Sequence, residues 1–341
     1  MKAMKFVEKI RKQGTSHVLR KWLPLILIIT AQLLAFRIYA ATPDLEKSPP
    51  EIRIGFQKSA INLILLKQRG SLDAVFPNSK VTWSEFPAGP QLLEALSVGS
   101  IDFGLTGDTP PVFAQSAGKD VIYVGVEPPK PRTSAILVPA NSSIKSLKDL
   151  KGKRIAFQKG SSSHNLVVRA LKKAGLSWGD IDPAYLPPAE GRAAFEKGSV
   201  DAWAIWDPYF AAAELSSFKP RVLATGEGLS DNNSFYLSSA SFTQNYPEAI
   251  KKLLIALTEA DQYIYTNKKD SAIAYSNYSG LPLDVVYRFV DRRPVAPTTP
   301  LSAKTIAEQQ RVADAFYQLG LIPKPIFVSE AVAKPTTGKP K

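Results

Sequence analysis

Ile54-Gly-Phe-Gln-Lys58 and Ile155-Ala-Phe-Gln-Lys159 are two copies of one short pattern, and a second shared pattern follows each of them. This second pattern is Gly99-Ser-Ile-Asp102 in the first copy and Gly198-Ser-Val-Asp201 in the second, and it begins 45 and 43 residues after the first pattern begins. Two matched segments in the same order at nearly equal spacing indicate duplication or a shared scaffold. The sequence therefore predicts two lobes of one design.

Short apolar runs alternate with amphipathic segments around these patterns, which is typical of βαβ units on a largely parallel sheet. In the first copy we expect strands at Ile52–Phe56, Val81–Glu85, Ile101–Leu105 and Val121–Val126, and helices at Ala60–Arg69, Pro90–Val98 and Pro110–Ala117. Near the end of the chain we expect helices at Phe242–Thr266, Lys269–Ser279, Leu283–Val290 and Ser302–Leu319. The fold class is α/β, with this helical C-terminal segment packed on the first lobe.

The chain should cross from one lobe to the other within Glu127–Val138 and return within Asp231–Ser239. We therefore assign residues 51–138 and 235–328 to lobe one and residues 139–234 to lobe two. Residues 42–50 are expected to form a linker. Residues 329–341, which include a proline- and lysine-rich end, are expected to be a disordered tail.

Residues 1–41 have the features of a secretory signal peptide. A basic segment precedes the apolar run Leu23–Phe36, and small residues follow at Ala40 and Ala41. The run of about 14 residues is shorter than the roughly 20 that span a bilayer, so an uncleaved anchor is the second interpretation. The chain has no cysteine, which excludes a lipid-anchored lipoprotein, thiol catalysis and thiolate metal sites. We expect the mature chain in an extracytoplasmic compartment.

The charge distribution does not demand a polyanion such as nucleic acid. Of the net charge of +13 over 341 residues, +7 lies in residues 1–41, which carry eight Lys and Arg against one Glu. The modest positive balance of the remainder suits a protein that binds a small anion.

The ligand site should lie between the lobes, because ligands of open α/β sheets bind beyond the carboxyl ends of the strands. Both copies send equivalent loops there: Gln57 follows the first strand of lobe one, and Thr106, Gly107 and Asp108 follow its third strand. In lobe two the equivalent third-strand loop begins at Trp206.

Lys159-Gly-Ser-Ser-Ser-His-Asn165 lies between a predicted strand and a predicted helix. Backbone N–H groups at a helix start are unpaired, and the hydroxyls of Ser161, Ser162 and Ser163 add further donors, so this turn is a candidate anion cradle. The alternative is that one serine simply caps the helix.

Trp203 and Trp206 can supply an apolar wall and an N–H donor to the site. Residues three apart on a strand point to opposite faces, so only one of them should line the cleft, and Trp206 at the strand end is favoured. That both tryptophans belong to the core is the alternative.

Four charged residues near the predicted cleft could have either a structural role or a role in ligand binding. Asp108 and Asp207 each precede a proline near a helix start, which favours capping or contact between the lobes over contact with a cationic part of a ligand. Arg292 and Arg293 could reach the mouth of the cleft, but we expect them to be solvated at the surface.

His164 is one of two histidines, and the other, His17, lies in the leader. A serine adjacent to its histidine in a helix does not provide an oriented nucleophile–base pair, and no Gly-x-Ser-x-Gly elbow is present. His164 is therefore either a hydrogen-bond donor to an anion or a structural residue. The sequence has no metal-ligand cluster and no glycine-rich nucleotide fingerprint, so no cofactor is expected.

Several segments resemble the periplasmic aliphatic-sulfonate-binding proteins of bacterial ABC importers, within the nitrate/sulfonate/taurine group. The resemblance covers roughly residues 51–326 and is carried by Trp83-Ser-Glu-Phe-Pro-Ala-Gly-Pro-Gln91, Gly99-Ser-Ile-Asp-Phe-Gly-Leu-Thr-Gly-Asp108, Val124-Gly-Val-Glu-Pro-Pro-Lys-Pro131, Ala156-Phe-Gln-Lys-Gly-Ser-Ser-Ser-His-Asn-Leu166 and Asp201-Ala-Trp-Ala-Ile-Trp-Asp-Pro208.

This resemblance implies a type II periplasmic-binding-protein fold that closes on an alkanesulfonate and delivers it to an ABC permease with a cytoplasmic ATPase, for sulfur acquisition. It also implies a periplasmic monomer with no catalytic activity. The contacts that it implies are Gln57, Thr106, Gly107, Asp108, Ser161, Ser162, Ser163, His164, Trp203 and Trp206. Taurine or nitrate binding, or a biosynthetic enzyme on the same scaffold that uses His164, are the alternatives.

Overall fold

The computed structural model describes residues 48–333. The expected signal peptide and most of the expected linker lie outside this range. No helix of the described range is long and apolar enough to cross a membrane.

The first of two five-stranded sheets has the strand order β2-β1-β3-β10-β4. Its strands are β1 (Glu51–Phe56), β2 (Lys80–Glu85), β3 (Phe103–Gly107), β4 (Ile122–Glu127) and β10 (Ser234–Ser238). β1 is parallel to both β2 and β3, whereas β10 runs antiparallel to its neighbours β3 and β4. The sheet therefore combines a parallel βαβ part with one returning strand.

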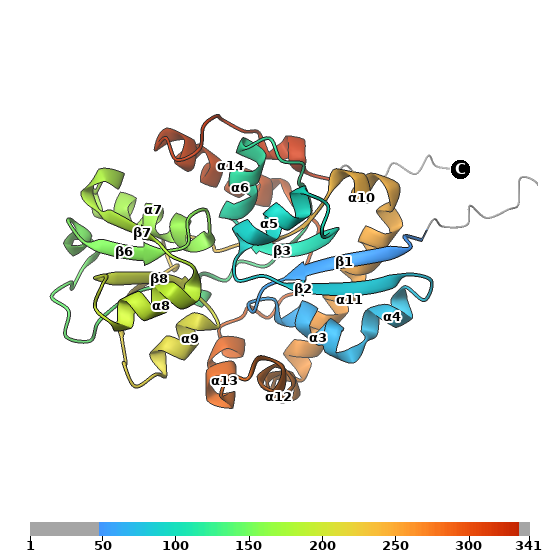
Figure 1. The fold of residues 1–341 in the computed structure, drawn as a ribbon, viewed down its shortest axis with the longest axis horizontal. Coiled ribbons are helices and arrows are strands. Elements are labelled where there is room, and N and C mark those ends of the chain that lie inside the picture. Colours follow the sequence, from blue (N-terminus) through green and yellow to red (C-terminus); the bar gives the residue numbers. More distant parts are fainter. Residues whose placement is uncertain (1–47, 334–341) are drawn as a thin grey trace, which may run out of the picture. The chain divides into compact units, whose positions relative to one another are not determined.

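The second sheet repeats this arrangement with the order β7-β6-β8-β5-β9. Its strands are β5 (Ser134–Val138), β6 (Arg154–Phe157), β7 (Asp182–Tyr185), β8 (Ala202–Trp206) and β9 (Arg221–Thr225). β6 is parallel to β7 and β8, and β5 is antiparallel to β8 and β9. The two sheets thus match strand for strand, as the repeated sequence patterns predict. Figure 1 labels β1, β2 and β3 of the first sheet and β6, β7 and β8 of the second. Each sheet with the helices that cover it is called a lobe below.

The expected end of lobe one at residue 138 is wrong, because β5 belongs to the second sheet. The run Ser134–Val138 is buried along its whole length and pairs with β8 on one side and β9 on the other. A fully buried apolar strand needs hydrogen-bonded neighbours on both edges, and only the second sheet supplies them here. The chain therefore crosses between β4 and β5, through the short 3₁₀ turn η1 (Pro131–Thr133).

Helices flank the strands of both sheets. In lobe one they are α3 (Ile61–Arg69), α4 (Ser71–Val75), α5 (Gly89–Ser97) and α6 (Thr109–Ser116). In lobe two they are α7 (Ser162–Ala174), α8 (Pro188–Glu196) and α9 (Tyr209–Glu214), with the 3₁₀ turns η2 (Leu147–Leu150) and η3 (Trp178–Asp180).

The C-terminal segment is helical and packs mainly on lobe one. It comprises α10 (Ala240–Asn245), α11 (Pro247–Thr266), α12 (Lys268–Ser279), α13 (Leu283–Asp291), α14 (Ala303–Gln318) and the 3₁₀ turn η4 (Val328–Ala331). The single helix expected over Phe242–Thr266 is two helices, since Pro247 cannot donate a helical N–H and starts a new one. α11 packs on α3 and α4, and α14 packs on α6, whereas α13 also contacts α9 of lobe two.

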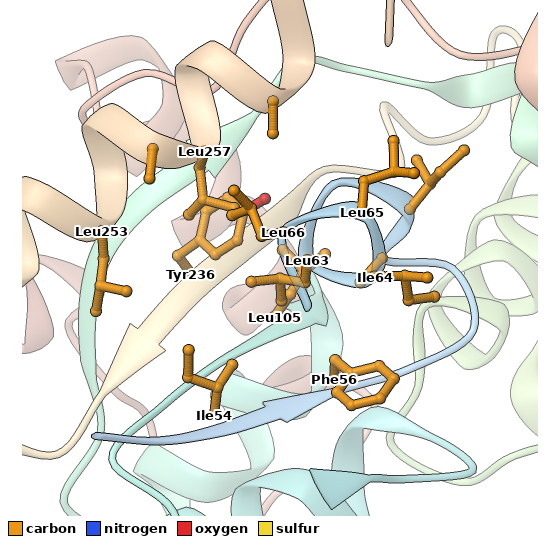
Figure 2. Packing of buried hydrophobic residues seen from close by; sticks show 14 of the residues in the cluster. Ile54, Phe56, Leu63, Ile64, Leu65, Leu66, Leu105, Tyr236, Leu253 and Leu257 are labelled. Carbon is orange, nitrogen blue, oxygen red and sulfur yellow. The ribbon is translucent and has the colours of Figure 1, made fainter. Parts of the chain in front are cut away.

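The largest apolar cluster of lobe one lies between α3, the first sheet and α11. Figure 2 shows Leu63 of α3 beside Leu105 of the sheet and Leu66 of α3 beside Leu257 of α11. All residues of α3 from Ile61 to Leu66 are buried, because the sheet covers one side of this helix and α11 the other. This packing fixes the end of β1, where the first lobe contributes to the interlobe region.

The expected disordered tail is wrong for its first residues. Val328 and Ala331 of η4 are buried in the cluster that includes Phe316 of α14, and the backbone N–H of Ala333 donates to the carbonyl of Tyr123 at 2.9 Å. Apolar side chains at these positions therefore anchor the segment to β4. Residues 334–341 lie outside the described range.

Candidate functional site

A small cavity of about 30 Å³ lies between the two lobes, beyond the carboxyl ends of β1, β3 and β8 and at the start of α7. This is the place that open α/β sheets use for ligands. Its walls are formed by Gln57, Ser59, Gly89, Gly107, Pro110, Lys130, Thr133, Ser161, Ser162, Trp206, Asp207, Asn232, Ser234, Phe289 and Arg293.

The structure divides the ten residues predicted for the site into two groups of five. The residues on the cavity wall are Gln57, Gly107, Ser161, Ser162 and Trp206. The residues that lie behind the wall or elsewhere are Thr106, Asp108, Ser163, His164 and Trp203.

The start of α7 presents backbone donors to the cavity. Gly160 takes a left-handed conformation (φ +71°), which turns the chain so that the helix begins at the cavity. The hydroxyl of Ser161 donates to the carbonyl of Gln158 at 2.8 Å, and no side chain caps the helix. The side-chain hydroxyls of Ser161, Ser162 and Ser163 therefore do not cap α7. The first amides of α7 have no intrahelical partner and can meet an anion.

Ser163 faces away from the cavity. Its side chain is fully buried, and its Oγ has no hydrogen-bond partner among the described residues. Thr106 is likewise buried, with its hydroxyl donating to the carbonyl of Gly107 at 3.1 Å. Both residues shape the two sides of the cavity from behind, since each neighbours a residue of its wall.

Two aspartates at equivalent strand ends link the lobes. The amide of Asn165 on α7 donates to Asp108 Oδ2 at 2.8 Å, and Arg292 at the end of α13 donates to Asp207 Oδ1 at 3.2 Å. Burial raises the pKa of Asp108. Burial also raises the pKa of Asp207, which Arg292 partly offsets, to about 7. This geometry fits the expected contact between lobes. Asp207 also accepts from the N–H of Ala211 at 2.9 Å.

The expected surface location of Arg292 and Arg293 is wrong, because both side chains are only 8% exposed. Arg292 lies over the ring of Phe210, 3.9 Å from its centroid, and pairs with Asp207 and Glu214 of lobe two. Arg293 lines the cavity. Buried arginines require carboxylate partners, and these come from distant parts of the chain.

Lys130 and Arg293 form a buried cationic cluster around Glu127. Glu127 Oε2 lies 2.6 Å from Lys130 Nζ, and its Oε1 lies 2.8 Å from Arg293 Nη2. Lys130 also donates to the hydroxyl of Ser234 at 2.7 Å. Both cations line the cavity, whereas Glu127 does not.

The electrostatics of this cluster follow from burial and ion pairing. Burial opposes ionisation of Glu127, but the attraction of Arg293 and Lys130 outweighs it and lowers the pKa of Glu127 to about 2. Burial lowers the pKa of Lys130, and Glu127 partly offsets this. The attraction of Glu127 raises the pKa of Arg293 against the effect of burial. Glu127 is therefore an anion that holds two cations at the cavity.

Lys130 and Arg293 line the cavity but are not among the contacts predicted from the sequence, where Arg293 at the mouth of the cleft is only the alternative to a surface position. Lys130 lies within the quoted segment Val124-Gly-Val-Glu-Pro-Pro-Lys-Pro131, and its pairing with Glu127 three residues before it is the signal that was available. For Arg293 the sequence carries no such signal, since its partner lies 166 residues earlier in the chain.

The two tryptophans of β8 have different surroundings, and only one of them lines the cavity, as expected. Trp206 lines the cavity and makes an edge contact with Tyr209, with ring centroids 6.2 Å apart. Trp203 is fully buried beside Phe195, and a β-carbon on Gly191 of α8 would lie 2.8 Å from its Nε1. Trp206 is therefore the cavity residue and Trp203 a core residue.

His164 lies in an aromatic cluster that both lobes contribute to. The rings around it are Phe113 and Phe316 of lobe one, and Phe157, Trp178 and Tyr185 of lobe two. Its Nδ1 accepts from the N–H of Gly160 at 3.2 Å, and burial together with Lys159 lowers its pKa to about 3. A neutral, fully buried imidazole off the cavity wall fits the structural role and not direct contact with an anion.

No metal site is present between residues 48 and 333, since no group of three or more His, Cys, Asp or Glu there could hold an ion. The cavity therefore offers hydrogen-bond donors, two cations sharing one carboxylate, and the indole of Trp206.

The family described as NMT1/THI5 like matches residues 84–272. The chain is 47% identical over 312 residues to an Escherichia coli (strain K12) protein named for aliphatic sulfonate binding, covering 92% of this chain and 97% of the relative.

Two crystal structures are similar throughout the described lobes. One is the alkanesulfonate-binding protein of Xanthomonas axonopodis pv. citri bound to MOPS, with 50% identity and a TM-score of 0.81 over 84% of this chain and 99% of that chain. The other is the periplasmic aliphatic sulphonate binding protein of Escherichia coli, with 48% identity and a TM-score of 0.79 over 86% of this chain and 95% of that chain. The fold expected from sequence is thereby confirmed.

Proposed function

This chain belongs to the NMT1/THI5-like family, and from that premise we propose that it is the extracytoplasmic solute-binding protein of an ABC importer that captures aliphatic sulfonates between its lobes. Its similar proteins of known structure are sulfonate-binding proteins at about half sequence identity. The protein is a carrier and not an enzyme.

The observation that carries this proposal is the meeting of three features in one interlobe cavity. Lys130 and Arg293 supply positive charge, the start of α7 supplies unpaired N–H groups, and Trp206 supplies an apolar wall. A sulfonate needs all three, because it is a monoanion with three acceptor oxygens, no proton to donate and an attached apolar carbon. Charge-assisted hydrogen bonds of about 1.5–3 kcal/mol each, several together, reach the roughly 8 kcal/mol of micromolar binding.

We assign ligand contact to the wall residues Gln57, Gly107, Ser161, Ser162 and Trp206, and add Lys130 and Arg293 to them. The other predicted residues do not contact the ligand and instead support the cavity wall; these are Thr106, Asp108, Ser163, His164 and Trp203. Asp108 does so by its link to Asn165 of lobe two, which closes the lobes over the ligand.

The partners follow from the same assignment. The closed protein delivers its ligand to permease subunits in the inner membrane that a cytoplasmic ATPase drives, for sulfur acquisition. It acts as a periplasmic monomer after residues 1–41 are removed as a signal peptide. The biosynthetic-enzyme alternative has no support from the site, because His164 is enclosed by aromatic rings and does not line the cavity.

Calorimetry on the chain from Thr42 onward tests the proposal. Ethanesulfonate, taurine, nitrate and sulfate are titrated separately in a buffer without sulfonate groups. We expect ethanesulfonate to bind and the double variant Ser162→Ala, Trp206→Ala to lose this binding. Heat from nitrate alone, or from none of the four, contradicts sulfonate capture and leaves the two-lobe fold intact.

A further inference from the structure

The buried cluster of Lys130, Arg293 and Glu127 has one more positive charge than negative charge. Lys130 and Arg293 share a single carboxylate, that of Glu127, with contacts of 2.6 and 2.8 Å. Asp207 is the other ionisable group on the wall, and it shares Arg292 with Glu214. Two cations against one carboxylate give the cluster of Lys130, Arg293 and Glu127 a net charge of +1.

A second buried carboxylate, Asp261, acts on the charges of Lys130 and Arg293 without contacting either side chain. Its Oδ1 accepts from Asn62 at 2.9 Å, and its Oδ2 accepts from the N–H and hydroxyl of Thr298 at 2.8 and 2.7 Å. In the described part of the chain it makes no hydrogen bond or ion pair with Lys130 or Arg293. Burial and the nearby charge of Glu127 raise its pKa, and Arg293 and Thr298 partly offset this.

We infer that Glu127 sets the charge of the anion that this site accepts, so that the site selects a monoanion over a dianion of the same shape. The inference rests on the proposed function and specifies the electrostatic basis of its selectivity. Glu127 is a positioning residue: it does not line the cavity, and it acts by holding and partly neutralising the two cations that do.

The physical reason is the free-energy cost of an uncompensated charge in the small cavity between the lobes. A monoanion bound beside Lys130 and Arg293 brings the local charge to zero. A dianion leaves one negative charge uncompensated, which is strongly unfavourable away from water. The same dianion would be balanced if the carboxylate of Glu127 were absent.

Methanesulfonate and sulfate are a matched pair of probes, since both are tetrahedral and they differ by one unit of charge. The measured quantity is the ratio of their dissociation constants, determined by calorimetry. We expect the unmodified protein to prefer methanesulfonate by at least about tenfold. Glu127→Gln should shift the ratio toward sulfate by at least about tenfold, which corresponds to about 1.4 kcal/mol.

Two further variants separate local charge from other effects. Glu196→Gln changes the net charge of the protein equally but lies on the surface of α8, paired with Arg192, and should leave the ratio unchanged. The double variant Glu127→Gln, Lys130→Gln returns the local charge to +1 and should restore the preference for methanesulfonate.

Circular dichroism and thermal unfolding show whether Glu127→Gln is folded. If it is folded and its ratio equals that of the unmodified protein, the inference is wrong. If it is not folded, Lys130→Gln decides: sulfate affinity should fall about tenfold more than methanesulfonate affinity, and an equal loss for both overturns the inference. Failure of the unmodified protein to bind any alkanesulfonate would instead refute the proposed function.

Discussion

Gly107 and Ser162 lie in contact across the two lobes: a β-carbon placed on Gly107 would be 3.0 Å from Cβ of Ser162 and 3.2 Å from its Oγ. Gly107 ends β3 of lobe one, and Ser162 begins α7 of lobe two. Both line the cavity. The absence of a side chain at position 107 therefore permits the two lobes to approach closely at the ligand site.

Replacing Gly107 with alanine should weaken ligand binding more than it weakens the fold. The added methyl meets Ser162 only when the lobes are together, so it penalises the closed arrangement. Overpacking of this kind costs about 1–3 kcal/mol, and we expect roughly tenfold weaker binding of ethanesulfonate by calorimetry. Gly179→Ala is the control, because a β-carbon there meets nothing within 4 Å. Unchanged affinity in Gly107→Ala would refute this role of the glycine.

The two tryptophans of β8 should separate ligand sensing from stability. Trp206 lines the cavity, so Trp206→Phe should abolish the change in tryptophan fluorescence that ethanesulfonate causes and weaken its binding. Trp203 is enclosed between the sheet and α8, so Trp203→Phe should keep the fluorescence change and lower the unfolding temperature. A fluorescence change that survives in Trp206→Phe and disappears in Trp203→Phe would reverse the assignment.

Sequence reasoning was most successful where local pattern and repetition carry the information. The two copies beginning at Ile54 and Ile155 predicted two equivalent sheets. The strand period predicted that only one tryptophan lines the cavity, and the position of Trp206 at the strand end favoured it over Trp203. Both are short-range properties: alternation along one strand, and the position of a loop after it. The location of Ser161 and Ser162 on the cavity wall follows from the same rule.

The predictions that were wrong concern residues whose neighbours come from distant parts of the chain. Two adjacent arginines in the sequence suggest that both side chains are exposed to solvent. In the structure both are buried: Arg292 forms ion pairs with Asp207 and Glu214, and Arg293 forms one with Glu127. Such burial depends on carboxylates brought together by the fold. The placement of β5 in the second sheet likewise depends on its pairing with β8 and β9, which lie far along the chain. The local sequence of β5 does not encode these partners.

His164 should make the fold less stable as the pH falls. Its pKa of about 3 lies below its ordinary value of 6.5, so the unfolded chain takes up a proton between these values and the folded chain does not. The free energy of unfolding should therefore lose about 2 kcal/mol between pH 6.5 and pH 5 through this residue. His164→Asn, which keeps an acceptor for Gly160, should remove this loss in urea unfolding at several pH values. An identical pH slope in the variant and the unmodified protein would contradict it.

Asp207 should have the opposite effect over nearly the same pH range. Its pKa of about 7 lies above its ordinary value of 3.8, so the folded chain holds a proton that the unfolded chain has released. Its contribution to stability therefore falls as the pH rises from about 4 to 7, by about 1.4 kcal/mol per unit. Asp207→Asn keeps an acceptor for the N–H of Ala211 and removes this slope.

The contributions of Asp207 and His164 should therefore nearly cancel between pH 5 and pH 6.5 in the unmodified protein. Asp207→Asn exposes the His164 slope, so its unfolding free energy should rise by about 2 kcal/mol from pH 5 to pH 6.5 relative to that of the unmodified protein. His164→Asn should show a fall of similar size. The double variant, with both groups removed, should regain the pH profile of the unmodified protein in this window. A single variant with the same pH slope as the unmodified protein would show that the group removed titrates near its ordinary pKa in the folded chain.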